Sequence, residues 1–223
     1  MSKLNKYYKI LGIVVILMVF LTITIYIVGD ALKLSSTDSS HFRTLITYVI
    51  EFIFLRILFK VLDLKQIKFP LFFFVLLLVS ALIDILGENF AFYQIIPICD
   101  VIGHFISGLL FFFLSVVGLE KVYINSKMHP LIFVLLCISV SLSFEIIWEL
   151  LEYSSDYFTH SNMLRAINSL TGEAYVGLQA VQDTMEDILL CLSGCLVGAI
   201  TVLIGIKKNK LSLFTLQTIK QNN

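Results

Sequence analysis

The sequence predicts an all-α membrane protein, a bundle of six transmembrane helices with both termini in the cytoplasm. Of its 223 residues 58% are apolar and 14% are charged, whereas soluble domains average roughly 45 to 50% and about 25%. Six apolar stretches approach the roughly 20 residues that a helix needs to cross a hydrocarbon layer about 30 Å thick. Sixteen basic residues balance sixteen acidic ones. We therefore expect the lipid bilayer as the partner and no nucleic acid.

The six helices follow from these stretches in chain order. The first comes after three lysines, but its apolar stretch is longer than that of a signal peptide and no small-residue cleavage site follows, so we expect a retained helix. The last three are apolar over most of their length and carry ionisable residues at one end. We expect residues 1–223 to form a single membrane domain with helices at about 10–28, 42–59, 69–86, 99–119, 130–151 and 183–206, and an external loop at 152–182.

The basic residues predict the orientation, because Lys and Arg concentrate in cytoplasmic segments. Twelve of the sixteen fall on one side, in the N-terminal tail, the second loop, the fourth loop and the C-terminal tail. The opposite side carries Lys33, Arg43 and Arg165, while Arg56 lies within the second helix. We therefore expect a multi-pass protein of the inner (cytoplasmic) membrane, with both termini in the cytoplasm.

Ionisable residues enter the last three helices, all at the expected external side. Such residues cost about 2.5 to 3.5 kcal/mol at the centre of a spanning helix, so they indicate a functional site. Within each helix they stand three, four or seven positions apart and share one face. The residues are Asp100 and His104 in the fourth helix, Glu145, Glu149 and Glu152 in the fifth, and Asp183 and Asp187 in the sixth.

Small residues lie along the same helices. Gly103 and Gly108 make the fourth helix slim near His104, and Gly194 and Gly198 form a Gly-x-x-x-Gly pattern in the sixth helix. This pattern lets a neighbouring backbone approach closely. The four cysteines have the spacing of neither a disulfide framework nor a zinc site. Two of them stand one turn apart in the sixth helix, and we interpret them as packing residues. The fourth, fifth and sixth helices are expected to pack with their acidic faces turned inward.

Three segments resemble the YjdF-like family of bacterial inner-membrane proteins, in the order in which that family carries them. The match spans roughly residues 100–198. The resemblance implies the topology and the membership of the site, and it supplies no reaction, because this family is a domain of unknown function. The matching segments are Asp100-x-x-x-His104-Phe105-x-x-Gly108-Leu109, Ser141-x-Ser143-x-x-x-x-Trp148-Glu149-x-x-Glu152-Tyr153, and Tyr175-x-Gly177-x-Gln179 followed by Asp183-x-x-x-Asp187 and Gly194.

The sequence departs from the family pattern at two places. Trp148 and Tyr153 exchange the positions at which the family has Tyr and Trp, which keeps aromatic residues on both sides of the Glu pair. Gln179 precedes Asp183 by four residues instead of five, and the acidic residue that the family carries after its Gln-Gly is absent. The resemblance therefore implies no acidic ligand from the loop.

The main functional hypothesis is a divalent cation site. Carboxylates and a single imidazole suit Mg²⁺, Mn²⁺ or Zn²⁺, and a cation would let several acidic groups lie close together. Such a site would serve a membrane-embedded hydrolase, in which a spare Glu acts as the base. The proposed ligands are Asp100, His104, Glu149 and Asp187, with Glu145, Glu152, Asp183 and Gln179 as secondary residues.

Two other classes of function remain open at this point. An ion- or proton-coupled transporter would use the same groups as a relay, although no inverted repeat or broken helix is visible in the sequence. A non-catalytic accessory membrane protein would use them only to fasten its helices together. No nucleophile elbow, phosphate-binding loop or HExxH helix is present, so the sequence does not decide whether the protein is an enzyme.

The predicted topology can be tested by cysteine labelling in intact cells. A cysteine introduced at Lys127 should react only after the membrane is permeabilised, and one at Ser161 should react with an impermeant reagent from outside. Labelling of both positions from the same side would contradict the arrangement.

Overall fold

The computed structural model of the chain contains two compact units, Met1–Cys99 with Leu216–Asn223, and Asp100–Thr215. The predicted span 42–59 lies outside the described residues, and spans 10–28 and 69–86 are described at a few positions, all of them helical. The structure describes residues 97–160, 162–168 and 171–211, together with residues 10, 13, 24, 67, 68, 72, 73, 75–77, 79, 80, 83, 214, 217 and 218.

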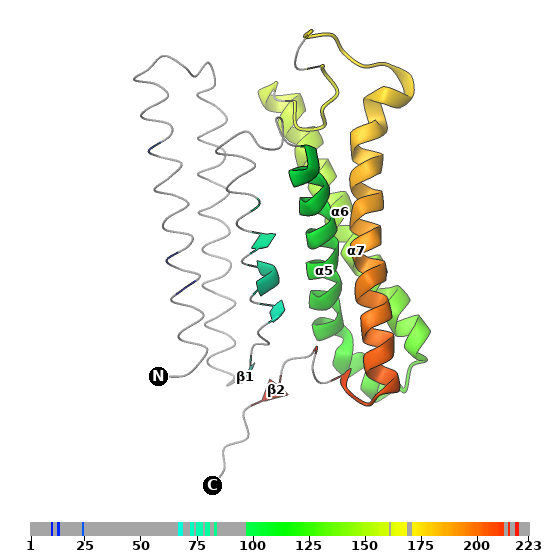
Figure 1. The fold of residues 1–223 in the computed structure, drawn as a ribbon. Coiled ribbons are helices and arrows are strands. Elements are labelled where there is room, and N and C mark those ends of the chain that lie inside the picture. The colour runs from blue at the N-terminus through cyan, green and yellow to red at the C-terminus, as the bar shows by residue number, and fades with distance from the viewer. Residues whose placement is uncertain are drawn as a thin grey trace. The chain divides into compact units, whose positions relative to one another are not determined.

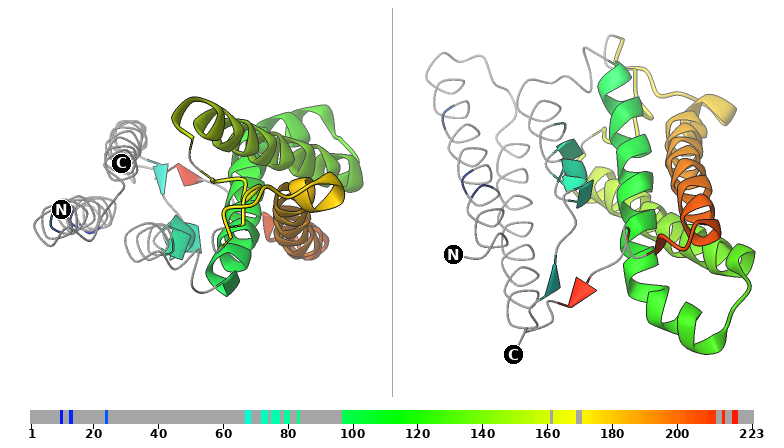
Figure 2. Two further views of the ribbon diagram at one scale, coloured as in Figure 1. Left: turned by 90° about the horizontal axis from the view of Figure 1, so that it is seen from above. Right: turned by 60° about the horizontal axis from the view of Figure 1, so that its bottom comes forward.

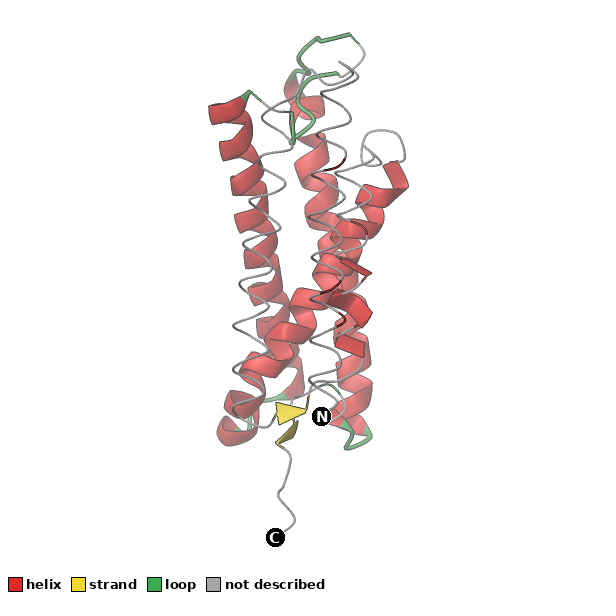
Figure 3. Ribbon diagram, turned by 90° about the vertical axis from the view of Figure 1, so that its left-hand side faces the viewer, coloured by secondary structure: helices red, strands yellow, loops and turns green. Residues whose placement is uncertain are grey.

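Three long helices account for most of the described residues (Figure 1). They are α5 (Pro97–Ser126), α6 (Pro130–Thr159) and α7 (Gln182–Lys207), and the short 3-10 helix η1 (Gly177–Val181) leads into α7. Each long helix lies in a stretch that is long and apolar enough to cross a membrane. The last three predicted spans therefore correspond to three candidate membrane-spanning helices, and the described part of the chain is mostly helical (Figure 3).

The connections between the helices have clear local causes. Lys127 adopts a left-handed conformation after α5, and His129 then caps α6 by accepting a hydrogen bond from Leu131 N at its Nδ1 atom. Pro130 occupies the first turn of α6, where the missing N–H costs nothing. Because the connection is so short, α5 and α6 run in opposite directions, and α6 crosses behind α5 and α7 in the view of Figure 1.

Helix α6 is longer than the sequence predicted. The predicted end was at Leu151, but the helix continues for two more turns, to Thr159, and ends at His160 in the left-handed conformation. The added segment contains neither Gly nor Pro, so no residue with a poor helix propensity of that kind stops the helix. The α6–α7 connection therefore begins at His160 instead of Glu152, and its last residues form η1.

Glycines let α7 approach α5 to backbone contact. A Cβ atom on Gly108 would collide with the backbone of Cys191, and one on Gly194 would collide with the carbonyl of Phe105. A Cβ atom on Gly198 would lie 2.5 Å from the ring of Phe112, so that close approach is to a side chain. The predicted packing face of α7 thus meets α5, as the view from above also shows (Figure 2). Gly103 is half-buried on α5.

A buried polar contact joins all three helices at one point. Ser141 on α6 donates a hydrogen bond to the carbonyl of Gly108 on α5, at 3.2 Å, and Cys195 on α7 lies 3.2 Å from the Ser141 hydroxyl. Ser141 and Cys195 are fully buried. Their polar atoms are therefore satisfied inside the bundle, as an apolar environment requires.

A short antiparallel strand pair lies in the other unit. Strand β1 (Ile67–Lys68) pairs with strand β2 (Gln217–Thr218), with Ile67 opposite Thr218 and Lys68 opposite Gln217. The pairing joins the second predicted loop to the C-terminal tail. These two segments therefore lie on the same side of any membrane that the chain crosses.

The glycine contacts lead to a stability prediction with a control on the same helix pair. Gly194→Ala should destabilise the detergent-solubilised protein, because the added methyl group meets rigid backbone of α5 and the helices must separate. Gly118→Ala should leave the melting temperature unchanged or raise it, since a Cβ atom there meets nothing within 4 Å and Ala favours a helix by about 1 kcal/mol over Gly. Equal melting temperatures for the two variants would contradict the close α5–α7 contact.

Candidate metal centre

The predicted ionisable residues meet at the end of the bundle that carries the α6–α7 connection, which we call the loop end. His104 lies at the centre of the group. It comes from the second turn of α5, Glu145 from the second half of α6 and Asp187 from the second turn of α7. Glu145 and Asp187 are only 2% and 4% exposed. The three acidic helix faces are therefore turned inward, toward one histidine.

The Nδ1 atom of His104 is engaged in a hydrogen bond. His104 Nδ1 lies 2.6 Å from Oε1 of Glu145. An ionised carboxylate can only accept, so we place the proton of this bond on Nδ1, which leaves Nε2 as the nitrogen that can act as a ligand. A carboxylate behind the imidazole of a metal-binding histidine orients the ring and raises its basicity. Glu145 has the position of such an orienting residue.

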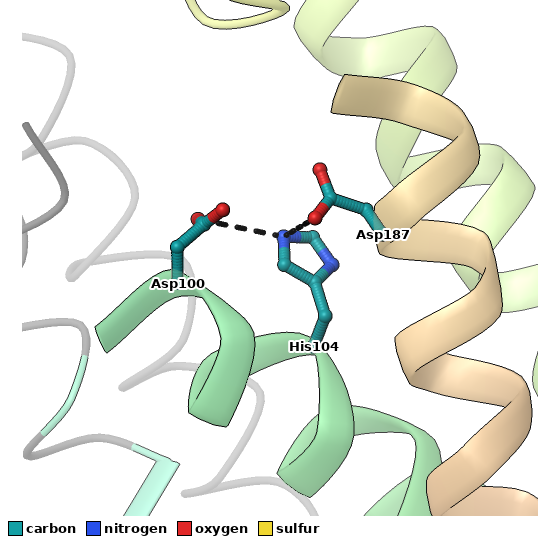
Figure 4. A group of neighbouring side chains, drawn as sticks. All are labelled: Asp100, His104 and Asp187. Atoms are coloured by element: carbon teal, nitrogen blue, oxygen red, sulfur yellow. Dashed lines mark ion pairs between the residues drawn. The ribbon is translucent and has the colours of Figure 1, made fainter. Parts of the chain in front are cut away.

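The second nitrogen faces two aspartates, as Figure 4 shows. His104 Nε2 lies 3.7 Å from Oδ1 of Asp100 and 3.6 Å from Oδ1 of Asp187. These distances are too long for the hydrogen bonds of a charged imidazolium, which measure about 2.7 to 2.9 Å. Ligand atoms that each lie about 2.1 Å from a shared ion stand about 3 to 3.5 Å apart. The two nitrogen–oxygen distances lie slightly above this range, and the three side chains form a group that could hold a metal ion.

Glu149 is buried in the group without a hydrogen-bond partner among the described residues. Its side chain is 7% exposed, and neither carboxylate oxygen has a hydrogen-bond partner within the described residues. Thr184 on α7 is a polar side chain that lies close to it. Glu149 can place an oxygen within 4.8 Å of donor atoms of His104 and Glu145. A buried and unpaired carboxylate is costly, so a cation or a proton must compensate its charge.

The secondary residues predicted from the sequence have different surroundings. Glu152 accepts a hydrogen bond of 2.9 Å from Trp148 Nε1, one turn away on α6. Asp183, in the first turn of α7, lies 3.2 Å from a nitrogen of Arg165. Gln179 lies in η1 with an exposed side chain, and no contact in the described part of the chain joins it to the cluster. Asp183 therefore lies at the site, whereas Glu152 has a partner outside it.

Arg165 brings a fixed positive charge to the loop end, a role that the sequence did not reveal. Its Nη1 atom lies 3.0 Å from Oδ2 of Asp100 and 3.2 Å from Oδ1 of Asp183. Burial alone lowers the pKa of Arg165, but the charges of Asp100, Asp183 and Asp187 outweigh it and raise the pKa above its ordinary value. The guanidinium is therefore always charged, and it ties the connecting segment to α5 and α7.

A family comparison identifies the chain. The family described as predicted membrane protein (DUF2238) matches residues 10–208. The chain belongs to this family. The resemblance predicted from the three motifs is thereby confirmed, and the match extends beyond them to the N-terminal half. None of the curated proteins and none of the solved structures compared with the chain matches it.

Membership agrees with the surface of the described helices. This DUF2238 protein leaves large apolar side chains exposed along all three, among them Ile102, Leu150 and Ile200. Apolar surface on this scale is typical of lipid contact and not of a soluble monomer. The chain is therefore a membrane protein whose helices have apolar outer faces and an ionisable cluster within.

One sequence signal pointed to Arg165 in this DUF2238 protein. It is the single Lys or Arg in the longest connection between predicted spans. The sequence reasoning counted it only as a loop charge, because nothing local relates residue 165 to residue 100. The contact depends on how the connection folds over the helix ends.

Neutralisation of Glu149 should stabilise the protein, because its carboxylate has no hydrogen-bond partner among the described residues. In chelator, Glu149→Gln should raise the free energy of unfolding by about 1 to 3 kcal/mol, because a neutral amide costs less to bury than an unpaired carboxylate. Glu186→Gln on α7 is the control and should change little, since this side chain is exposed and its amide oxygen can still accept from Gln182. A loss of stability in Glu149→Gln, measured by thermal unfolding, would mean that the carboxylate has a partner.

Proposed function

We propose that the protein holds a divalent cation at the loop end of the α5–α7 bundle. The ligands are Asp100 Oδ1, His104 Nε2 and Asp187 Oδ1, and Glu149 acts as a fourth donor, directly or through a bound water. The observation that carries the proposal is the arrangement around His104, in which Nδ1 is engaged by Glu145 while Nε2 faces two carboxylates at 3.6 and 3.7 Å. This is the arrangement of a ligand histidine with an orienting carboxylate.

The charge of the cluster supports the same proposal. Asp100, Glu145, Glu149, Asp183 and Asp187 face His104 and the single arginine of the connection. If the carboxylates are ionised, these two residues do not balance them. Close and partly buried carboxylates repel one another unless a cation or protons compensate them. A divalent ion supplies two charges at the point where the ligand atoms converge.

The donor set favours Mg²⁺, Mn²⁺ or Zn²⁺, because it combines carboxylate oxygens with one imidazole nitrogen and no thiolate. A bound ion of this kind supplies Lewis acidity and activates water. The chain itself supplies Glu149, a buried carboxylate beside the centre that can accept a proton. The reaction class that these groups would serve is hydrolysis of a substrate that reaches the loop end.

A carrier is the less favoured function. From the cluster toward the other end of the bundle, α5 carries no charged side chain before Glu120, and α7 none before Lys207. The part of α6 that precedes Glu145 is also uncharged. These three helices therefore provide no series of ligands along which an ion could cross the membrane. A site confined to one end suits binding or catalysis better.

We also propose that residues 1–223 form a single membrane domain with six spanning helices and both termini in the cytoplasm, in the inner (cytoplasmic) membrane. The distribution of Lys and Arg supports this orientation. The pairing of β1 with β2 supports it as well, because it joins two segments that the proposal assigns to the cytoplasm. The loop end and its cluster then face the outside.

The cation proposal is tested with protein purified in detergent without chelator. Mn²⁺ should bind, as measured by the loss of the free-ion signal in electron paramagnetic resonance, and should raise the melting temperature. A hundredfold excess over the dissociation constant stabilises the folded state by about 2.7 kcal/mol. Asp187→Asn should abolish binding, while Glu145→Gln should weaken it about 10- to 100-fold, as the loss of an orienting partner does.

The matched control is Glu186→Gln, which removes a carboxylate from an exposed position next to Asp187. It should bind Mn²⁺ as the wild type does. Equal binding by Glu186→Gln and Asp187→Asn would place the ion elsewhere. A wild-type protein that contains no divalent metal by elemental analysis and responds to none of Mg²⁺, Mn²⁺ and Zn²⁺ would overturn the proposal.

A further inference from the structure

Asp100 is shared between the candidate metal centre and Arg165. Its Oδ1 atom faces His104 Nε2 at 3.7 Å, while its Oδ2 atom lies 3.0 Å from Nη1 of Arg165. The same nitrogen lies 3.2 Å from Asp183. One fixed positive charge thus stands directly beside a carboxylate that the proposed cation needs. A bound divalent ion and the guanidinium would therefore both interact with the single negative charge of Asp100.

Side-chain hydrogen bonds to the backbone fix the turn that carries Arg165. Both carboxylate oxygens of Asp156, near the end of α6, accept backbone hydrogen bonds, from Met163 N at 2.7 Å and Leu164 N at 3.0 Å. The side chain of Asn162 bonds both backbone groups of Ile167. Arg165 lies between these anchors with a left-handed φ of 49°. The turn therefore presents the guanidinium to the cluster.

We propose that Arg165 is an internal counter-cation that sets the affinity and the charge selectivity of the metal centre. It neutralises Asp100 and Asp183 when no divalent cation is bound, and its contact with Asp100 weakens when a cation binds. This inference rests on the proposed function. The role of Arg165 is to compete with the ion through Asp100, and it is not itself a ligand.

Selectivity for charge follows from the competition. A monovalent ion that displaces the guanidinium from Asp100 only replaces one unit charge by another. Its binding therefore gains little electrostatic energy. An ion with two charges gains more from the surrounding carboxylates. Without Arg165 a monovalent ion also gains from binding at Asp100, so monovalent ions should then compete for the site.

The alternative role for Arg165 is to orient Asp100 so that Oδ1 points at the cation. The two roles predict opposite changes in metal affinity when Arg165 is removed. Removal of an orienting residue weakens metal binding. Removal of a competing charge strengthens it, because like charges a few ångströms apart repel, and the repulsion doubles for a divalent ion. Both oxygens of Asp100 are engaged at the same time, and the guanidinium is about one-third exposed, so it can move away. We therefore expect the competing role.

The test compares Mn²⁺ binding by full-length wild-type protein, Arg165→Gln and Arg165→Lys, using the paramagnetic resonance titration. Arg165→Gln should bind Mn²⁺ about tenfold more tightly than the wild type, and K⁺ should compete for its site more strongly. Arg165→Lys keeps the charge and should bind within about threefold of the wild type. Lys208→Gln, which removes an exposed charge beyond the end of α7, is the control and should bind as the wild type does.

Stability supplies a second measurement. In chelator, Arg165→Gln should melt at a lower temperature than the wild type, because Asp100 and Asp183 lose their counter-ion. Addition of Mn²⁺ should raise the melting temperature of Arg165→Gln by more than it raises that of the wild type. If Arg165→Gln survives purification only with Mn²⁺ present, the rate at which excess chelator removes the ion is compared instead. Slower release than from the wild type supports the inference, and faster release overturns it.

The outcomes separate this inference from the proposed function. If the wild type binds Mn²⁺ and Arg165→Gln binds it equally or more weakly, Arg165 is not a competing charge and the inference is wrong, while the metal centre stands. If Arg165→Gln alone binds, the competition is supported and the wild-type site is blocked by its arginine. If none of the proteins binds Mn²⁺, both proposals are overturned.

Discussion

The hydrogen bond between His104 and Glu145 is the contact on which the rest of the site depends. It joins α5 to α6 inside the bundle and engages Nδ1, so that Nε2 faces Asp100 and Asp187. Without it the imidazole could turn, and the two aspartates would have no common neighbour. In an apolar surrounding such a bond has no water to compete with it. One interhelical contact thus orients the ring that the other charged groups surround.

Close packing of small residues makes this contact possible. Gly108 and Gly194 bring the backbones of α5 and α7 together, and Ser141 joins α6 to both one turn away from Glu145. Bulkier residues at these points would move Asp187 away from His104. The glycines and the charged residues are therefore one structural unit, in which the packing sets the distances between ligand atoms.

The cluster lies in the half of the three-helix bundle that carries the α6–α7 connection. Carboxylates are more tolerable toward the end of a spanning helix than at its centre. Arg165 reaches the cluster from the turn that Asp156 and Asn162 hold in place. The connection between α6 and α7 is therefore part of the site, as well as a link between two helices.

The sequence by itself determined that the chain is a membrane protein, and it located three of its helices and the level of the ionisable residues. The length of an apolar stretch and the spacing of residues along a helix are local properties, so they can be read from the sequence without knowledge of the fold. It did not determine the end of α6, because neither Gly nor Pro marks that end and the helix continues past its most apolar stretch. Only the tertiary structure decided that Glu145 bonds His104, that Glu149 is buried without a hydrogen-bond partner among the described residues, and that Arg165 reaches Asp100. These are contacts between residues far apart in the chain, which depend on how helices rotate against one another and on the path of a connection, and no local pattern encodes either.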